Sequence, residues 1–326
     1  MIANQRPQTM KHLTKVIPCY NEQEVLQESF DRLAELASAI KEQKGYHTRL
    51  LFVDDGSADT TWTIVEKLNK EHPQLVAGVK LAANVGHQQA LMAGLEHAVA
   101  DSDIMVSIDA DLQDDIAAVQ QMIDSYEAGS DIVYGVRRER KSDTFFKRTT
   151  AQLFYRMMGS LGVKTVYNHA DFRLMSRRAV EHLCQYRERN LFLRGIVPLL
   201  GFPTATVYYD RSPRTAGQSK YSLAKMTGLA VDGITSFSIR PVRMVMAMGL
   251  LFLLVTLGIL CYVLHAYIIG NTVPGWTSLM LSVWFVGGCM LMALGIVGEY
   301  VGKTYIEVKD RPRYHVEQTL GSHVSE

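Results

Sequence analysis

The stretch 103-DIMVSIDADLQDD-115 joins a short apolar run to a loop that is rich in carboxylates. The apolar part, "IMVSI", has the length and composition of a buried β-strand. The part from Ser107 to Asp115 then places four carboxylates within nine residues. Carboxylates this close repel one another, so water, a basic partner or a metal ion has to offset their charge. The pattern therefore predicts a strand that ends in a polar loop able to bind a ligand.

Short apolar runs followed by longer amphipathic stretches recur along the N-terminal half of the chain. The predicted strands are "TKVIP", "RLLFVDD", "LVAGVKL" and "SDIVYGV", which begin at residues 14, 49, 75 and 130. Helices are predicted at 22–43, 57–68, 86–99, 115–129 and 144–161. This alternation predicts an α/β fold of Rossmann-like type, with a mostly parallel sheet that helices cover on both faces. The first strand is expected to be short, because Lys15 interrupts its apolar run.

Acidic residues end two of these strands. Asp54 and Asp55 follow "LLFV", as Asp109 and Asp111 follow "IMVSI". A solvated acidic loop would explain either pair alone. However, ligands in open α/β sheets bind beyond the carboxyl ends of the strands. The coincidence of the two pairs therefore indicates a binding site at that edge of the sheet.

The spacing of Asp109, Asp111 and Gln113 favours a hard divalent cation. Carboxylates at i and i+2 after a strand can turn toward one point, and oxygen ligands suit Mg²⁺ or Mn²⁺, which also bind substrate phosphates. An EF-hand loop beginning at Asp109 fails, because position 6 is Asp114 and position 12 is Gln120. Zinc is disfavoured without nearby Cys or His, and nothing else supports a phosphoaspartyl intermediate. We therefore expect a divalent metal that carries a diphosphate.

Composition excludes several other classes of protein. The 326 residues carry a formal net charge of +1, which argues against a nucleic-acid-binding protein. The four cysteines are far apart and contain no C-x-x-C pair, which argues against a disulfide framework or a zinc site. The N-terminus is polar and lacks the apolar region of a signal peptide.

Two long uncharged segments, 244–269 and 276–297, predict membrane spans at 242–270 and 276–298. Arg240 and Arg243 precede the first uncharged segment, and basic residues follow the second span. By the positive-inside rule, both outer flanks face the cytoplasm and the linker 271–275 faces outward. Residues 218–241 carry apolar positions at helical spacing next to the first span, which core packing would explain as well as an amphipathic interfacial helix. The tail 299–326 is expected to be cytoplasmic, so the predicted location is the cell membrane.

Several motifs resemble those of family 2 glycosyltransferases of the GT-A fold. They are "IPCYNE" at 17–22, "VDDGSADTT" at 53–61, "NVGHQQALMAGL" at 84–95 and "DADLQD" at 109–114. Further motifs, "RNLFLRG", "AGQSKYSLAKM" and "DGITSFSIRPVR", look like the polyprenyl-phosphate branch, which includes bactoprenol glucosyltransferases and dolichol-phosphate mannose synthase. The resemblance implies a GT-A domain over residues 1–217. It departs from the family where "DIAAV" replaces the usual prolines after "DADLQD".

The resemblance implies inverting transfer of a monosaccharide from a nucleotide sugar to a polyprenyl phosphate, such as undecaprenyl phosphate. UDP-glucose and UDP-N-acetylglucosamine are the favoured donors, and a flippase and a second transferase are the expected partners, with a homo-oligomer left open. The implied nucleotide-sugar residues are Pro18, Tyr20, Glu22, Asp54 and Asp55. The implied catalytic residues are Asp109, Asp111 and Asp171, with Asp109, Asp111 and Gln113 at the metal. The implied acceptor-phosphate residues are Arg137, Arg148, Arg214 and Lys220.

Some of these roles stay open at the level of sequence. Asp171 could orient the attack or could hold Arg173 in a structural ion pair. Arg137 could contact the acceptor phosphate or could belong to a solvated charge run. His87, near the start of a predicted helix, is expected to be structural. A processive polysaccharide synthase is disfavoured by the absence of a Q-x-x-R-W motif, and a non-enzymatic scaffold by the intact acidic residues.

Overall fold

The computed structural model describes residues 10–138, 169–189, 192–210, 240–269 and 275–321. The chain divides into two compact units. The first holds residues 1–151, 165–221 and 311–326, and the second holds residues 152–164 and 222–310. The candidate site belongs to the first unit.

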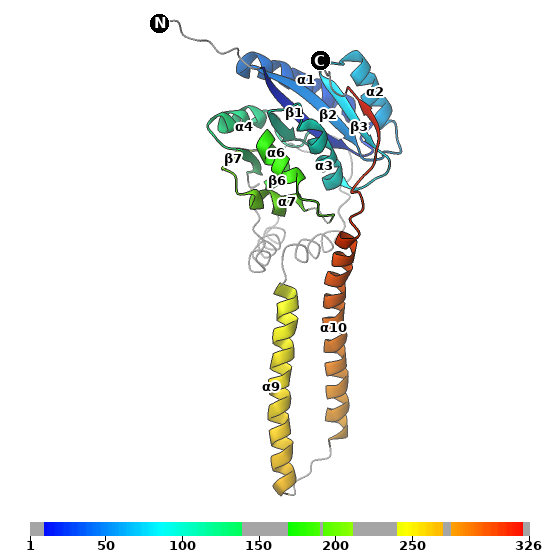
Figure 1. The fold of residues 1–326 in the computed structure, drawn as a ribbon, viewed down its shortest axis with the longest axis vertical. Helices are drawn as coiled ribbons and strands as arrows, with labels where there is room; N and C mark the ends of the chain where they lie inside the picture. The colour runs from blue at the N-terminus through cyan, green and yellow to red at the C-terminus, as the bar shows by residue number, and fades with distance from the viewer. Residues whose placement is uncertain (1–9, 139–168, 190–191, 211–239, 270–274, 322–326) are drawn as a thin grey trace. The chain divides into compact units, whose positions relative to one another are not determined.

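An eight-stranded sheet forms the centre of the first unit (Figure 1), in the order β7-β5-β6-β4-β1-β2-β3-β8. The central strands β4, β1, β2 and β3 are parallel, whereas β6 and β8 are antiparallel to their neighbours. The predicted mostly parallel sheet is therefore confirmed. The bounds are β1 Lys11–Cys19, β2 Tyr46–Asp54, β3 Val76–Leu81, β4 Ile104–Ser107, β5 Ile132–Arg137, β6 His169–Ser176, β7 Thr204–Tyr209 and β8 Val316–Leu320.

Helices cover both faces of this sheet (Figure 1). The helices α1 (Leu26–Lys44), α2 (Thr61–Glu71) and α4 (Ala118–Glu127) share one hydrophobic core on one face, and α3 (His87–Ala98) and α6 (Arg177–Cys184) lie on the other. Two short helices follow, α7 (Leu193–Ile196) and η1 (Val197–Leu200). A Cβ atom on Gly94 of α3 would lie 2.3 Å from Cγ1 of Val16, so only glycine lets α3 approach β1 this closely. The close packing of α3 positions the loop that precedes it.

The expectation of a short first strand is wrong. β1 pairs with β2 over nine residues without interruption, from Lys11 to Cys19. Lys15 is fully buried on the face that packs against α1, and its Nζ lies 3.5 Å from the carbonyl oxygen of Leu33. The aliphatic stem of a lysine can pack as an apolar side chain, which explains why the strand continues through this position.

Strand β8 was not predicted. It follows the C-terminal helix in sequence and pairs antiparallel with β3, where Thr319 lies opposite Val79. Its five residues are mostly polar and exposed, so no hydrophobic alternation marks it in the sequence. It covers a sheet edge that would otherwise present unpaired backbone groups.

The second unit contains two long apolar helices, α9 (Arg240–Ile269) and α10 (Trp276–Val308). Both are long and apolar enough to cross a membrane. They contact each other through Phe252 and Phe285, whose ring centroids lie 5.6 Å apart. α10 continues beyond the predicted end of the second span at residue 298.

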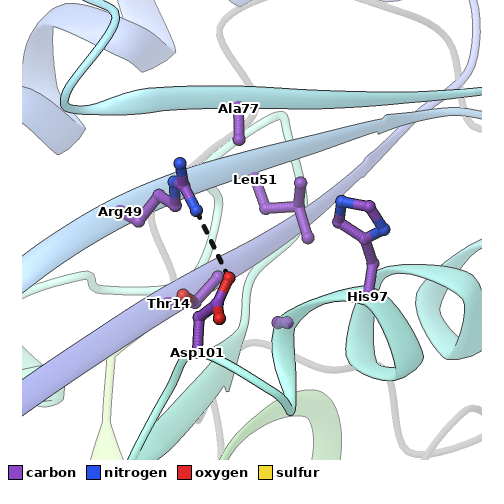
Figure 2. Close-up of a pocket in the computed structure, with 7 residues that line it drawn as sticks. Thr14, Arg49, Leu51, Ala77, His97 and Asp101 are labelled. Carbon is purple, nitrogen blue, oxygen red and sulfur yellow. Dashed lines mark ion pairs between the residues drawn. The ribbon is translucent and has the colours of Figure 1, made fainter. Parts of the chain in front are cut away.

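A small cavity lies beside the C-terminal end of α3 (Figure 2). Its lining comes from β1, β2 and β3 and from the end of α3: Thr14, Arg49, Leu51, Ala77, His97, Ala98 and Asp101. An ion pair of 3.8 Å between Arg49 and Asp101 crosses it. The space suits about one water molecule. The residues from β1 to β3 lie well before the carboxyl ends of their strands, so this cavity is separate from the acidic loops.

Candidate active site

The loops that follow β1 and β2 are tied together by hydrogen bonds. The backbone N–H of Asn21 donates to Oγ of Ser57 at 3.0 Å, and that of Ala58 donates to Oδ1 of Asn21 at 2.9 Å. The backbone N–H of Glu22 donates to Oγ1 of Thr61 at 3.0 Å. Asn21 takes a left-handed conformation, with φ of 53°, that asparagine tolerates better than most residues. Two predicted nucleotide loops therefore form one wall.

Asp55 organises the next loop along the sheet edge. Its carboxylate accepts hydrogen bonds from the backbone N–H groups of Val85 at 2.8 Å and Gly86 at 3.0 Å, and from the side chain of Asn84 at 3.0 Å. Burial raises the pKa of Asp55, while the two backbone donors act in the opposite direction. Gly56 lets the two loops approach this closely, because a Cβ there would lie 2.6 Å from the backbone of Ala83. Asp55 thus fixes the entry to α3.

The remaining predicted nucleotide residues surround these loops. Tyr20 is 43% exposed at the end of β1, whereas Pro18 is buried within that strand. Asp54 is fully buried, and its Oδ1 accepts a hydrogen bond from the backbone N–H of Ser57 at 3.3 Å. Burial raises the pKa of Asp54. Of these residues, Tyr20 presents the largest accessible surface.

The loop after β4 carries the two acidic residues of the predicted metal site. The hydroxyl of Ser29 donates to the carbonyl of Ala110 at 2.6 Å, which anchors the loop to α1. Leu112 takes a left-handed conformation, with φ of 41°. The chain therefore turns between the two acidic residues, Asp109 and Asp111, and Gln113. Asp109 and Asp111 are partly exposed, and Gln113 is buried.

Asp171, in β6, is the centre of a charged cluster that faces Asp109. Nη2 of Arg173 donates to its Oδ1 at 2.8 Å, and Nη2 of Arg194 donates to its Oδ2 at 3.1 Å. Nε2 of His87 lies 3.7 Å from Oδ1 of Asp109 and 3.8 Å from Oδ2 of Asp171. The cluster brings together side chains from β6, α7, α3 and the loop after β4.

The pKa values of the two carboxylates in this cluster, Asp109 and Asp171, are shifted in opposite directions. Burial alone would raise the pKa of Asp171, but the guanidinium groups of Arg194 and Arg173 hold it well below its usual range. The pKa of Asp109 is raised, first by desolvation, and the charge of Asp171 adds to this while His87 opposes it. Asp171 is therefore a fixed anion, whereas Asp109 gains most from a nearby positive charge.

Arg137 is already engaged by protein groups. Its Nε donates to Oδ1 of Asp114 at 3.1 Å and to the hydroxyl of Tyr209 at 3.2 Å. The Asp114 side chain is only 3% exposed, whereas that of Arg137 is 29% exposed. Its predicted contact with an acceptor phosphate stays a prediction. Arg148, Arg214 and Lys220 lie outside the described residues.

Sequence reasoning missed part of this cluster. Arg194 lies inside the motif "RNLFLRG" but received no role, and His87 was expected to be structural. His87 lies close to both Asp109 and Asp171, and its structural role stays a prediction. These contacts join residues that are far apart in the chain. The only signal for them in the sequence was the presence of charged side chains that had no assigned role.

Comparison with known proteins agrees with this arrangement. The profile of the family described as Glycosyl transferase family 2 matches residues 14–184. A Bacillus subtilis (strain 168) protein named uncharacterized glycosyltransferase YkoT is 51% identical over 96% of this chain and 93% of that protein. The chain belongs to glycosyltransferase family 2. Its α/β sheet is of the GT-A type, as the motifs predicted.

One further relative and one solved structure were also found to be similar to this family 2 enzyme. A bactoprenol glucosyl transferase of Shigella phage SfII is 38% identical over 94% of this chain and 98% of that protein. A solved structure of the mannosyltransferase PcManGT from Pyrobaculum calidifontis, in complex with GDP-Man and Mn²⁺, is 16% identical, with a TM-score of 0.44. That match covers 93% of this chain and 88% of the other.

The donor set of the glycosyltransferase site fits a hard divalent cation. Within the described part of the chain, no three His, Cys, Asp or Glu side chains form a complete metal-binding group. Mg²⁺ and ions like it are commonly held by only one or two carboxylates, with waters and substrate phosphates completing the coordination. Asp109 and Asp111, both partly exposed, are suited to such an incomplete set.

Proposed function

We propose that this family 2 glycosyltransferase moves a monosaccharide from a nucleotide sugar to a polyprenyl phosphate in the membrane. The observation that carries the proposal is the meeting of Asp109 and Asp171 at His87, beyond the carboxyl end of β4, in a chain with two membrane-length helices. The bactoprenol glucosyl transferase relatives favour a glucose donor, with UDP-N-acetylglucosamine as the alternative. The product would be a lipid-linked sugar for modification of a cell-envelope glycan.

The reaction needs positioning more than acid–base chemistry. An oxygen of the lipid phosphate attacks the anomeric carbon as the bond from that carbon to the diphosphate oxygen breaks, and the nucleoside diphosphate leaves. Attack from the opposite side inverts the configuration. The second pKa of a phosphate monoester is about 6, so the nucleophile is largely ionised at neutral pH. Catalysis then rests on orientation and charge stabilisation.

The residues of the site divide these tasks. Asp109 and Asp111, with Gln113, would hold Mg²⁺ or Mn²⁺, which when bound would neutralise charge on the departing diphosphate. Pro18, Tyr20, Glu22, Asp54 and Asp55 are assigned to the nucleotide side.

On the acceptor side, Arg137 is assigned to the lipid phosphate, together with Arg148, Arg214 and Lys220. Arg137 would exchange part of its contact with Asp114 for a phosphate oxygen. Asp171 stays ionised and would orient the reacting groups as a hydrogen-bond acceptor. Its depressed pKa argues against a role as a general base or acid near neutral pH.

The proposed location follows from the charges that flank the spans. Both ends of the helix pair face the cytoplasm, so the donor is a cytoplasmic nucleotide sugar. The lipid-linked product would then need a flippase and a second transferase on the other side of the membrane. The oligomeric state, including a homo-oligomer, is left to experiment.

The test is a lipid-extraction assay with the purified full chain, undecaprenyl phosphate and Mg²⁺ or Mn²⁺. UDP-glucose, UDP-N-acetylglucosamine and GDP-mannose are each supplied with a labelled sugar. We expect label in the organic phase with UDP-glucose, in a product of inverted anomeric configuration. Metal-dependent nucleotide binding without transfer from any donor would overturn the proposed substrates. Absence of nucleotide binding would overturn the enzymatic role.

A further inference from the structure

The residues that follow α10 form an extended segment, Arg311–Gly321, which we call the C-terminal strap. Its second half is strand β8, held on β3 by backbone pairing. Side chains reinforce the pairing, because Trp62 donates to Oε1 of Gln318 at 3.2 Å and Lys80 contacts Glu317 at 3.1 Å. These contacts secure the strap to the outer edge of the sheet.

The first half of the strap contacts the C-terminal part of α3 and the residues that follow α6. Nη2 of Arg313 donates to Oε1 of Glu96 in α3 at 2.7 Å, and its Nη1 donates to the carbonyl of Tyr186 at 3.3 Å. The hydroxyl of Tyr314 also donates to Glu96. In return, Nη1 of Arg189 donates to the strap carbonyl of Arg311 at 3.4 Å. The strap therefore joins α3 to the segment that begins at Tyr186.

The described residues 186–189 and 192–194 are joined in turn to the start of α3 and to the charged cluster. Nε2 of Gln89 donates to the carbonyl of Arg189 at 2.7 Å, and Oε1 of Gln88 accepts from the backbone N–H of Leu193 at 2.9 Å. Arg194 follows directly and binds Asp171 through two nitrogens, at 3.1 and 3.3 Å. His87, which comes directly before Gln88 in the sequence, contacts Asp171 and Asp109. Three consecutive side chains at the start of α3 thus connect the strap-bound segment to the catalytic carboxylates.

We propose that the C-terminal strap helps to position Arg194 in the charged cluster. Arg313 holds Tyr186 beside α3, and Arg189 joins the strap to Gln89, so that the strap helps to set the position of Arg194 against Asp171. Arg313 and Gln89 are positioning residues, because they act through the segment that begins at Tyr186. The inference rests on the proposed function for its kinetic consequence and on the contacts above for its structural one.

The experiment compares Arg313→Ala with Glu317→Ala in the full chain. Both variants remove one charged contact of the strap, but only Arg313 touches the segment. We expect Arg313→Ala to lower kcat for lipid transfer about tenfold, since a positioning group typically contributes that much. The Kd for the nucleotide should not change. Amide hydrogen exchange should rise within 186–194, and Glu317→Ala should match the wild type in every measurement.

The outcomes separate the two proposals. If the wild type transfers sugar and Arg313→Ala equals Glu317→Ala in both kcat and exchange, the strap is only a structural edge and the inference is overturned. If the wild type transfers no sugar, the proposed function fails, and faster exchange within 186–194 in Arg313→Ala would still support the strap. Unchanged exchange in that case would overturn the inference as well.

A second variant guards against a folding defect in Arg313→Ala. Gln89→Glu is nearly isosteric and cannot donate to the carbonyl of Arg189, so it should raise exchange in the same segment and lower kcat. Gln120→Glu on α4, which makes the same change in charge next to Gln43, is the control and should leave both unchanged. Equal behaviour of the two glutamate variants would count against the strap.

Discussion

Asp171 resolves one of the alternatives that sequence left open. It holds Arg173, whose guanidinium is almost fully buried, and it also faces His87 and the acidic loop after β4. A carboxylate with a strongly lowered pKa stays charged through the neutral range, so it suits orientation rather than proton transfer. The structural role is therefore present in the free protein, and the proposed catalytic role would use the same charge.

Asp171→Asn should destabilise the protein as well as inactivate it. The substitution leaves the buried Arg173 without its anionic partner, which typically costs about 3–5 kcal/mol. Because the folded pKa is depressed, this stabilisation is present above the unfolded pKa of about 3.9 and is lost as pH falls through the folded value. Thermal unfolding at neutral pH and at about pH 3 should therefore show a smaller difference between variant and wild type in acid.

The matched control for that variant is Asp101→Asn. Asp101 is exposed and lies 3.8 Å from Arg49, so its loss should cost at most about 0.5–1 kcal/mol. Equal destabilisation by both substitutions would show that Asp171 is not a specific anchor for Arg173.

Asp111→Asn should abolish metal-dependent transfer while the protein stays folded. An amide keeps the shape of the side chain but removes the charge that a divalent cation needs, so we expect a loss of at least about 100-fold. The measurement is lipid transfer together with metal-dependent nucleotide binding. Asp115→Asn is the control, since Asp115 is exposed and accepts a hydrogen bond from the nearby backbone N–H of Ala117 at 3.0 Å. Near-normal activity of Asp111→Asn would refute its role at the metal.

At the scale of elements, the sequence predicted the parts of the sheet that have strong local patterns. The parallel strands β2 to β5 follow continuous apolar runs, which is typical of strands buried on both faces, whereas β1 was predicted too short because of Lys15. Strand β6 was not predicted, because Asp171 and Arg173 interrupt its apolar residues. Strand β8 was missed because its stability comes from the β3 edge. The D-x-D motif could likewise be found in the sequence because its residues are close together in the chain, whereas the pairing of Asp171 with Arg194 depends on the fold.

The local pattern of β1 does not predict that Lys15 is buried. The burial of Lys15 can be tested through its effect on stability. Burial lowers its pKa from 10.5 to about 7, so the unfolded chain binds a proton that the folded chain does not, between pH ~7 and ~10.4. Stability should therefore rise with pH across that window. Lys15→Met removes the cost and should stabilise by on the order of a few kcal/mol at or below pH 7, with less gain near pH 10.

Unfolding temperatures at about pH 6.5 and pH 9.5 measure this difference. Lys11→Met, in the same strand, is the control, because the Lys11 side chain is 51% exposed and its loss should change stability by about 0.5 kcal/mol or less. A gain for Lys15→Met that does not depend on pH would show improved packing alone.

At the scale of the whole molecule, one chain combines a nucleotide-sugar fold with two apolar helices. The strap returns the chain from the second helix to the sheet, so the first unit is built from segments on both sides of the helix pair. If both helices span the membrane, the pairing of β8 with β3 requires that the two outer flanks of the helix pair lie on one side. The connectivity is therefore compatible with the orientation that the flanking charges predict.

This orientation predicts which positions are accessible from outside an intact cell. A cysteine introduced as Asn271→Cys, in the predicted outer linker, should react with a membrane-impermeant maleimide without disruption of the cell. Glu317→Cys in β8 should react only after permeabilisation, because the sheet that β8 completes lies on the cytoplasmic side. The parent chain gives the background from its four native cysteines. Labelling of both positions, or of Glu317→Cys alone, in intact cells would contradict the orientation, and with it the proposal that a cytoplasmic nucleotide sugar is the donor.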